Sequence, residues 1–499
     1  MTAADFAILA IYLAAVMGVG GIFFRRQKSL HEFFLGDRNI PWWAAAFSGI
    51  ATIVSAASFL GGPGQAFKSD LRYLQYRLGA PIAVFIIGWI MIPFFYRLRV
   101  YSIYEYLEAR FDRRTRVLAG AQFFLLKALF LGIAIYAPAL LFIEMTGLPL
   151  LPIVLAVGLL TTAYTAMGGV KAVIWTDSLQ VFILFGGLGA VAWRIFEQSG
   201  GWSKVAAEAA ASGKLRLFDT SWSLENEFTL WNGILGGAFV LLSQYGVNQA
   251  ELQKFLTTSN VAKARRALIW TIVVVTGIAV VFFLTGAALH VFYTAHPEKG
   301  GLAINPDRVM SKFILEELPP GWRGLLMAAV AAAAMSSISS ILNSLTAVAS
   351  ADFIGSYKKE WMTVRTARAV TVAIGILATG AALYVERMGN ILIAGTRMQN
   401  FLGGSLAGGF LLGMTSRRAN AKGAFWGIVL GTAAVAGLSS FTRISWMWHG
   451  IFAAGVAYFG GLALSLMTGR PPDSVQELVW RPGAATQESK SIHAELNCN

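Results

Sequence analysis

Long apolar stretches recur along almost the whole chain, separated by short polar loops. Most of them hold about 20 residues with few charges, which is the length that an α-helix needs to cross a hydrocarbon core of roughly 30 Å. The pattern predicts about thirteen transmembrane helices. The predicted spans are residues 4–24, 42–66, 73–97, 118–146, 150–168, 176–198, 231–252, 267–293, 323–350, 366–385, 391–415, 422–440 and 446–468.

Composition supports a membrane protein. Apolar residues make up 56% of the 499 residues and charged residues 13%, so a water-soluble fold would lack the polar surface to cover itself. We predict an all-α fold with one membrane domain over residues 1–470 and an unstructured polar tail, residues 471–499. The loops 199–230 and 294–322 are long enough for a short lid helix. The first span lacks a basic flank and a cleavage site, so we expect it to be retained.

The net charge of +14 does not indicate nucleic-acid binding, because the basic residues fall into alternate loops. Excess Lys and Arg marks the cytoplasmic side. We therefore predict a multi-pass protein of a cell membrane, in bacteria the inner membrane, with the N-terminus outside and the C-terminus in the cytoplasm. The lipid bilayer is the expected partner, and no feature indicates an obligate protein partner. The loop residues are Arg25, Arg26, Lys28, Arg97, Arg99, Arg113, Arg114, Arg116, Lys171, Lys254, Lys263, Arg265, Arg266, Lys358, Lys359, Arg365, Arg417, Arg418 and Lys422.

This topology gives two five-helix units of opposite orientation, about residues 42–198 and 231–415. Inverted-repeat transporters have this arrangement, with binding sites where discontinuous helices meet. In the first unit, Gly61-Gly62-Pro63-Gly64 predicts an interrupted helix, because proline removes an amide donor; the alternative is a helix end near the outer surface. A weaker counterpart in the second unit consists of Gly233, Gly236, Gly237 and Gly246.

Residues 333–344 place hydroxyl groups in the middle of an apolar span. At helical spacing, Ala333, Ser336, Ser337 and Ser340 fall on one stripe. Hydroxyls and the carbonyls of a broken helix are neutral oxygen ligands for a small cation at membrane depth. The alternative is that the serines bond to their own helix or hold helices together. A cation-coupled transporter is the function that this pattern favours.

A few charged residues lie inside or at the edge of predicted spans. Asp177 is a carboxylate that needs a partner or an ion within a membrane, unless it only caps a helix. Arg77, Lys127 and Arg397 are long basic side chains that either extend to the membrane surface or face a central cavity. A guanidinium in a cavity binds a carboxylate at two points, so Arg77 is our candidate for substrate binding.

Enzymatic functions find no support in the sequence. It has no phosphate-binding loop of the Gly-x-x-x-x-Gly-Lys-Ser/Thr type, so ATP does not drive the protein directly. The histidines are scattered rather than spaced as metal ligands. Cys498 is the single cysteine, which excludes an internal disulfide.

Several motifs resemble those of the sodium:solute symporter family, which includes the sodium/glucose, sodium/iodide, proline and sialic acid transporters. The similarity covers about residues 5–470. It implies a LeuT-type fold, a five-plus-five inverted repeat with an extra N-terminal helix, followed here by two extra C-terminal helices. The motifs are residues 33–36 with Arg38, 59–64, 104–111, 168–180, Asn248-Gln249 with Gln253, and Ser336-Ser337 with Asn343-Ser344.

The resemblance also implies cation sites, with Na⁺ as the coupling ion, one or two per cycle. A first sodium site would be formed by backbone carbonyls of Ala51, Val54 and Ala333 and by the hydroxyls of Ser336 and Ser337. Some relatives have a second sodium site, and the corresponding residues here are Asp177, Ser339 and Ser340.

Family substrate contacts correspond to Ser55, Ser58, Arg77, Gln244 and Tyr245. This sequence departs from the sugar carriers at Arg77 and at Thr396, which replaces a sugar-binding glutamine. It also departs from the sialic acid carriers, because Phe130 stands where they have a carboxylate-binding arginine. An arginine in the cavity favours an anionic solute, either a small carboxylate or an acidic sugar.

The sequence thus predicts a sodium-coupled symporter that imports a small anionic solute by alternating access. A neutral sugar or an amino acid is the alternative substrate. Proton coupling through Asp177 would leave the serine hydroxyls unexplained. A membrane sensor or receptor with the same fold is a rival of another class, although a tail of about thirty residues is short for a signalling domain. A passive channel fits an occluded ion site poorly.

Overall fold

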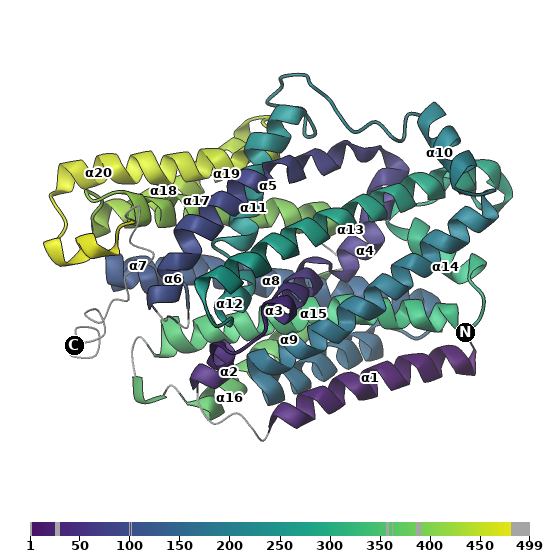
Figure 1. Ribbon diagram of the computed structural model, residues 1–499, viewed down its shortest axis with the longest axis horizontal. Helices are drawn as coiled ribbons and strands as arrows, with labels where there is room; N and C mark the ends of the chain where they lie inside the picture. Colours follow the sequence, from purple (N-terminus) through teal and green to yellow (C-terminus); the bar gives the residue numbers. More distant parts are fainter. Residues whose placement is uncertain are drawn as a thin grey trace.

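A computed structural model describes residues 2–24, 30–98, 100, 102–355, 359–361, 363–385 and 391–480. Every regular element among these residues is helical, which confirms the all-α prediction. The helices form one elongated bundle, with α1 and α20 at opposite sides (Figure 1). The first half of the chain contains α1 (Ala3–Phe24), α2 (Leu30–Leu35), α3 (Trp42–Ile53), α4 (Ala56–Lys68), η2 (Leu71–Gly79), α5 (Ala80–Phe85), η3 (Ile86–Met91), α6 (Ile92–Leu98), α7 (Glu105–Arg110), α8 (Arg113–Thr146), α9 (Leu150–Gln198) and α10 (Trp202–Ala211).

The second half continues the bundle and adds the C-terminal helices. It contains η4 (Asn232–Gly236), α11 (Gly237–Tyr245), α12 (Gln249–Leu256), α13 (Val261–Ala295), α14 (Val309–Glu317), α15 (Trp322–Val348), η8 (Ala349–Ile354), α16 (Val364–Ala382), α17 (Ile391–Thr415), α18 (Ala421–Phe441), α19 (Trp446–Gly455), η11 (Val456–Gly460), α20 (Gly461–Thr468) and η12 (Asp473–Leu478). The two longer loops contain α10 and α14, as predicted.

Within the described residues, 8 helices are long and apolar enough to cross a membrane, and the bent pair α3–α4 would make a ninth. The 49-residue α9 contains two predicted spans, because it kinks at Gly169, where φ is 52°. A positive φ of this kind is readily available to glycine alone. The multi-pass membrane architecture is therefore confirmed, whereas the count of thirteen spans and the inverted repeat stay predictions.

Helix α15 forms the centre of the bundle. All residues from 326 to 352 are buried, and the helix packs against α1, α3, α8 and α9. Its alanine-rich first half permits close approach: a methyl group on Gly187 of α9 would lie 2.7 Å from the Ala329 Cβ. Small residues allow such contacts between membrane helices. The serine-rich second half is thereby held away from lipid on all sides.

The interruption of the second predicted span lies earlier than the sequence indicated. Helices α3 and α4 meet at a bend of 59° around Val54 and Ser55, and α4 continues through Gly61-Gly62-Pro63-Gly64. The break is stabilised locally, because the amide of Ser58 donates to the Ser55 side chain (3.3 Å) and caps α4. The predicted position was wrong because glycine and proline here serve another purpose.

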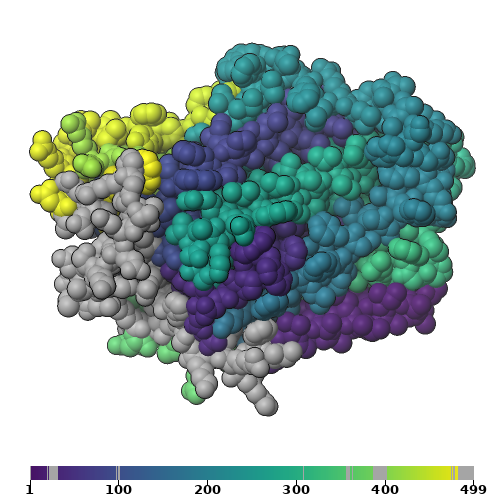
Figure 2. All heavy atoms as spheres, viewed as in Figure 1, coloured from purple at the N-terminus to yellow at the C-terminus, as the bar shows by residue number. Residues whose placement is uncertain are grey.

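That purpose is contact between α4 and α13. A methyl group on Gly62 would lie 3.3 Å from the Phe282 Cβ, and one on Gly286 would lie 2.1 Å from the Pro63 carbonyl oxygen. On the face in Figure 2, α13 also runs beside the earlier segment of α5 and α6, with which it makes contact. The glycines thus bring the two units together.

The second unit has its own interruption at Gly246, one of the four predicted glycines, whereas Gly233, Gly236 and Gly237 lie within η4 and α11. Helix α11 ends at Tyr245 and α12 begins at Gln249, after a cap in which Asn248 accepts a hydrogen bond from the Ala250 amide (3.1 Å). Each unit therefore contains one discontinuous helix. In inverted-repeat transporters, discontinuous helices are the elements from which ion and solute sites are built.

The start of the tail, which was predicted to be unstructured, contains a regular element. Residues 473–478 form η12, the Tyr106 hydroxyl donates to the Leu478 carbonyl (3.3 Å), and the Trp480 amide donates to the Met414 carbonyl (2.7 Å). The tail prediction was wrong for this segment because these contacts hold it against the bundle. Residues 481–499 lie outside the described part of the chain.

We predict that Gly286→Ala lowers the thermal stability of the purified protein, while Gly277→Ala on the same helix does not. The Gly286 methyl group would overlap Pro63, whereas nothing lies within 4 Å of a methyl group on Gly277. Overpacking of this kind costs about 1–3 kcal/mol. Thermal unfolding in detergent measures the difference, and equal Tm values for the two variants would contradict the close α4–α13 contact.

Candidate functional site

The serines of α15 contact the break between α3 and α4. The Ser336 hydroxyl donates to the carbonyl of Ala51 (2.8 Å), and the Ser337 hydroxyl donates to that of Thr52 (3.0 Å). Both hydroxyls also lie 3.1 Å from the Ala333 carbonyl. The two helices therefore present neutral oxygens to each other, as unwound helices do around sodium.

This geometry brings together four of the five residues predicted for the first sodium site: Ala51, Ala333, Ser336 and Ser337. The fifth, Val54, lies three residues after Ala51 in the break and lines the adjoining cavity. All five are buried. Their assignment as sodium ligands stays a prediction.

A second polar cluster surrounds Asp177, which is fully buried in α9. Its Oδ2 atom accepts hydrogen bonds from the hydroxyls of Ser48 (2.5 Å) and Ser340 (3.4 Å). Asp177 is therefore not a helix cap at the surface. Ser339, the third predicted member, does not join the cluster, because its hydroxyl donates to the Ser336 carbonyl of its own helix (3.0 Å).

Lys254 completes this cluster. The prediction that it is a cytoplasmic loop residue is wrong, because it is buried in α12 with its ammonium 3.4 Å from Asp177 Oδ2. The ammonium also donates to the Ser48 carbonyl (2.8 Å) and to the Thr52 hydroxyl. Ser48 and Thr52 were missed as well. Their spacing of four residues on one helix face was the available indication.

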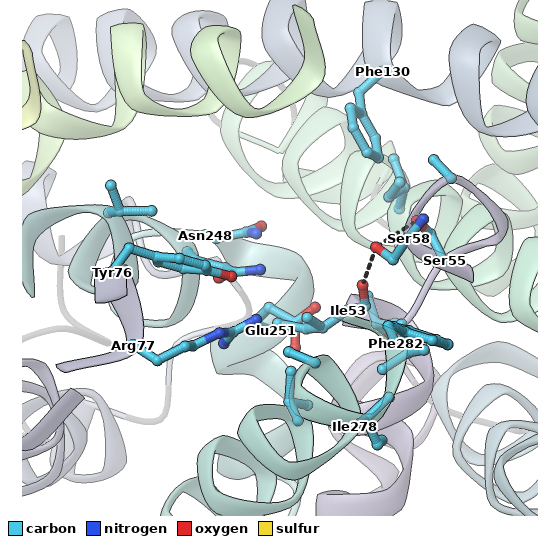
Figure 3. Close-up of a pocket in the computed structure, with 18 of the residues that line it drawn as sticks. Ile53, Ser55, Ser58, Tyr76, Arg77, Phe130, Asn248, Glu251, Ile278 and Phe282 are labelled. Atoms are coloured by element: carbon cyan, nitrogen blue, oxygen red, sulfur yellow. Dashed lines mark hydrogen bonds between the residues drawn. The ribbon is translucent and has the colours of Figure 1, made fainter. Parts of the chain in front are cut away.

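A cavity lies between the two discontinuous helices, next to the serine contact (Figure 3). Ser55, which caps α4, and Ser58 of α4 line one wall, and Tyr76 and Arg77 of η2 line another. Figure 3 shows the Arg77 side chain extending into this space below the Tyr76 ring, with its Cζ 4.5 Å from the ring centroid. The cavity thus combines hydroxyl groups, aromatic rings and a guanidinium.

Four of the six predicted substrate residues line the cavity: Ser55, Ser58, Arg77 and Gln244. Tyr245 is buried beside them but is not a lining residue. The side chains of Thr396 and Arg397 lie outside the part of the chain that the structure describes. Phe130 does line the cavity, as its correspondence to a substrate-binding position implies.

Two further charged side chains face the cavity. Lys127 is buried and lines the cavity, so the alternative prediction, that its side chain extends to the membrane surface, is wrong. Its ammonium lies 5.3 Å from the centroid of the Phe130 ring. Glu251 of α12 also lines the cavity and was not predicted. A carboxylate within the span 231–252 was the indication, since ionisable residues inside membrane segments usually have a function.

Comparison with known proteins agrees with this geometry. The family model described as "Sodium:solute symporter family" matches residues 33–431. The chain belongs to the sodium:solute symporter family. Sodium-coupled symport is therefore its function, with Na⁺ as the coupling ion, and it is not an enzyme.

Relatives in several organisms resemble this symporter over most of its length. It is 32% identical to a sodium/sialic acid symporter of Aliivibrio fischeri, over 98% of both chains. It is 32% identical to a sodium/sialic acid symporter of Proteus mirabilis, over 90% of this chain and 92% of the other. It is also 32% identical to the human sodium/iodide cotransporter, over 86% of this chain and 68% of the other.

A solved structure of a Na⁺-coupled sialic acid symporter, in a substrate-bound outward-open state, has the same fold. It aligns with a TM-score of 0.87 and 31% identity, over 94% of this chain and 99% of the other. The transporter Mhp1 aligns with a TM-score of 0.62 and 13% identity, over 89% of this chain and 97% of the other. This second likeness concerns the fold alone.

We predict that Ser337→Ala raises the sodium concentration for half-maximal uptake about tenfold, which corresponds to a loss of about 1.4 kcal/mol. Ser344→Ala is the matched control, because the Ser344 hydroxyl bonds to the Ile341 carbonyl of the same helix (2.7 Å). Uptake into proteoliposomes at graded sodium concentrations measures both variants. An equal sodium dependence would mean that the Ser337 hydroxyl only packs helices.

Proposed function

We propose that this symporter imports a small solute with a carboxylate group, which binds to Arg77. The proposal rests on the surroundings of the Arg77 guanidinium. It faces the cavity, and its Nε and Nη1 atoms have no hydrogen-bond partner among the described residues. Buried N–H groups of this kind are costly to leave unpaired. A carboxylate oxygen pair matches the geometry of a guanidinium.

The charges of the cavity favour an anion. Arg77 and Lys127 contribute two formal positive charges and Glu251 one negative charge, so the lining carries one net positive charge. An uncompensated charge in a low-dielectric site is unfavourable. A monoanion would neutralise it, and a sodium ion bound nearby would attract the same anion.

The relatives support an anionic substrate class. The names of those described above include sialic acid and iodide as the transported solutes, and both are anions at neutral pH. In this symporter Phe130 replaces the arginine expected from the sialic acid carriers. We therefore place the carboxylate at Arg77, and we favour a small carboxylate over a sialic acid.

Sodium at the Ser336–Ser337 site would hold α15 against the broken helix and so complete the adjoining cavity. The sodium ion and the solute would then be released to the cytoplasm by alternating access. Each sodium ion moving inward gains about 2.3 kcal/mol per 100 mV of membrane potential. Binding of sodium and of solute would be reciprocally linked.

The proposal includes the predicted topology, which has thirteen spans, an inverted repeat and an N-terminus outside the cell.

A zwitterionic solute, such as an amino acid, is the second candidate. Glu251 favours it, because a carboxylate facing the cavity would bind an ammonium group while Arg77 binds the carboxylate. Thermal stabilisation of the purified protein by a panel of monocarboxylates, sialic acid, amino acids and neutral sugars distinguishes the classes.

We predict that solute uptake into proteoliposomes requires an inward sodium gradient and stops when choline replaces sodium. A pH gradient alone should not restore it, because the serine hydroxyls do not titrate near neutral pH. Undiminished uptake in choline would exclude the sodium site at Ser336 and Ser337.

We predict that Arg77→Gln weakens binding of the transported carboxylate at least about 30-fold, because loss of one partner of a buried charge pair costs about 2–5 kcal/mol. Sodium affinity should change far less. Arg72→Gln on the same helix is the control, since Arg72 pairs with Asp70 and Asp219 rather than lining the cavity. Binding isotherms for solute and for sodium separate the two effects, and wild-type solute affinity in Arg77→Gln would contradict the proposal.

A further inference from the structure

The cluster around Asp177 already contains a cation. The Lys254 ammonium contacts Ser48 and Thr52 of α3 and the Asp177 carboxylate of α9. Ser340 of α15 bonds to both Asp177 and Thr52, at 3.4 and 2.8 Å. The ammonium thus contacts oxygens of two helices, α3 and α9, and Ser340 of a third helix bonds to two of those partners.

The formal charges of this cluster balance. Asp177 and Lys254 are both buried, and their opposite charges cancel. An added sodium ion would bring a second positive charge next to the ammonium, within a low-dielectric interior where like charges repel strongly. A sodium ion and the ammonium therefore do not share this cluster.

We propose that the Lys254 ammonium takes the place of a second sodium ion, so that this symporter binds one sodium ion, at the Ser336–Ser337 site. The inference deepens the proposed function and rests on its first sodium site. It also assigns Lys254 as the residue that determines the number of coupled ions.

The arrangement has a structural consequence. Lys254 lies on α12, beyond the interruption of the second unit, whereas Ser48 and Thr52 lie on α3, before the interruption of the first unit. The ammonium therefore holds one half of each discontinuous helix to the other without any ion from solution. A second sodium ion is not needed to form this contact.

The test counts sodium ions bound to the purified protein, with ²²Na⁺ alone as the ligand. Wild type should bind one ion with a Hill coefficient of about 1. Lys254→Met keeps an unbranched side chain one atom shorter and removes its charge, so it should bind two ions. Its thermal stability should fall in choline and recover in sodium. Lys254→Arg keeps the charge and should bind one ion.

The double variant Lys254→Met/Asp177→Asn should return to one bound ion, because it removes the carboxylate that the added ion needs. Two ions in wild type, or one ion in a folded Lys254→Met variant, would overturn the inference. If Lys254→Met does not fold, the single variant Asp177→Asn decides. The number of bound sodium ions stays at one if the ammonium fills the cluster, and it falls from two to one if a sodium ion fills it.

Failure of the proposed first site gives a different result. In that case wild type binds no sodium, while Lys254→Met still gains one ion that Asp177→Asn removes. The inference on Lys254 would then hold although the first sodium site would not.

Discussion

The serines of α15 bond to the carbonyls of the broken helix, and this contact joins the ion site to the solute cavity that we propose. Ser336 and Ser337 donate across to Ala51 and Thr52, and they do so within the buried part of α15, which begins at residue 326. The carbonyls are available because the chain leaves helical geometry at Val54 and Ser55. Without that break the carbonyls would be bonded within α3, and the hydroxyls would have only their own helix as a partner.

Close packing by small residues makes the contact possible. Alanines and glycines let α15 approach α9, and the glycines of α4 and α13 let these two helices meet almost backbone to backbone. Membrane helices lack a hydrophobic force that brings them together in lipid, so such packing supplies the contact energy. The glycines and proline of α4 therefore position the broken helix rather than break it.

Buried charge divides the polar interior into two parts. Around Asp177 the charges cancel within the protein, through Lys254. In the cavity they do not cancel, since Arg77 and Lys127 outnumber Glu251. A balanced cluster binds helices to one another, whereas an unbalanced one attracts a ligand from solution. This difference is why we assign a structural cation to the first and an anionic solute to the second.

Hydropathy, helical spacing and family motifs are properties of single segments, so the amino-acid sequence was enough to predict the membrane class, the helical architecture and the residues of α3 and α15 that meet at the break. Arg77, Ser55, Ser58 and Gln244 were likewise found from their motif positions. Only the tertiary structure placed Lys254 and Glu251, since a charge near a span end reads as a loop residue until its neighbours are known. It also located the break at Val54–Ser55, because a break that is capped by a serine needs neither glycine nor proline. The glycines of α4 instead allow the close approach of α13, which cannot be read from the α4 segment alone.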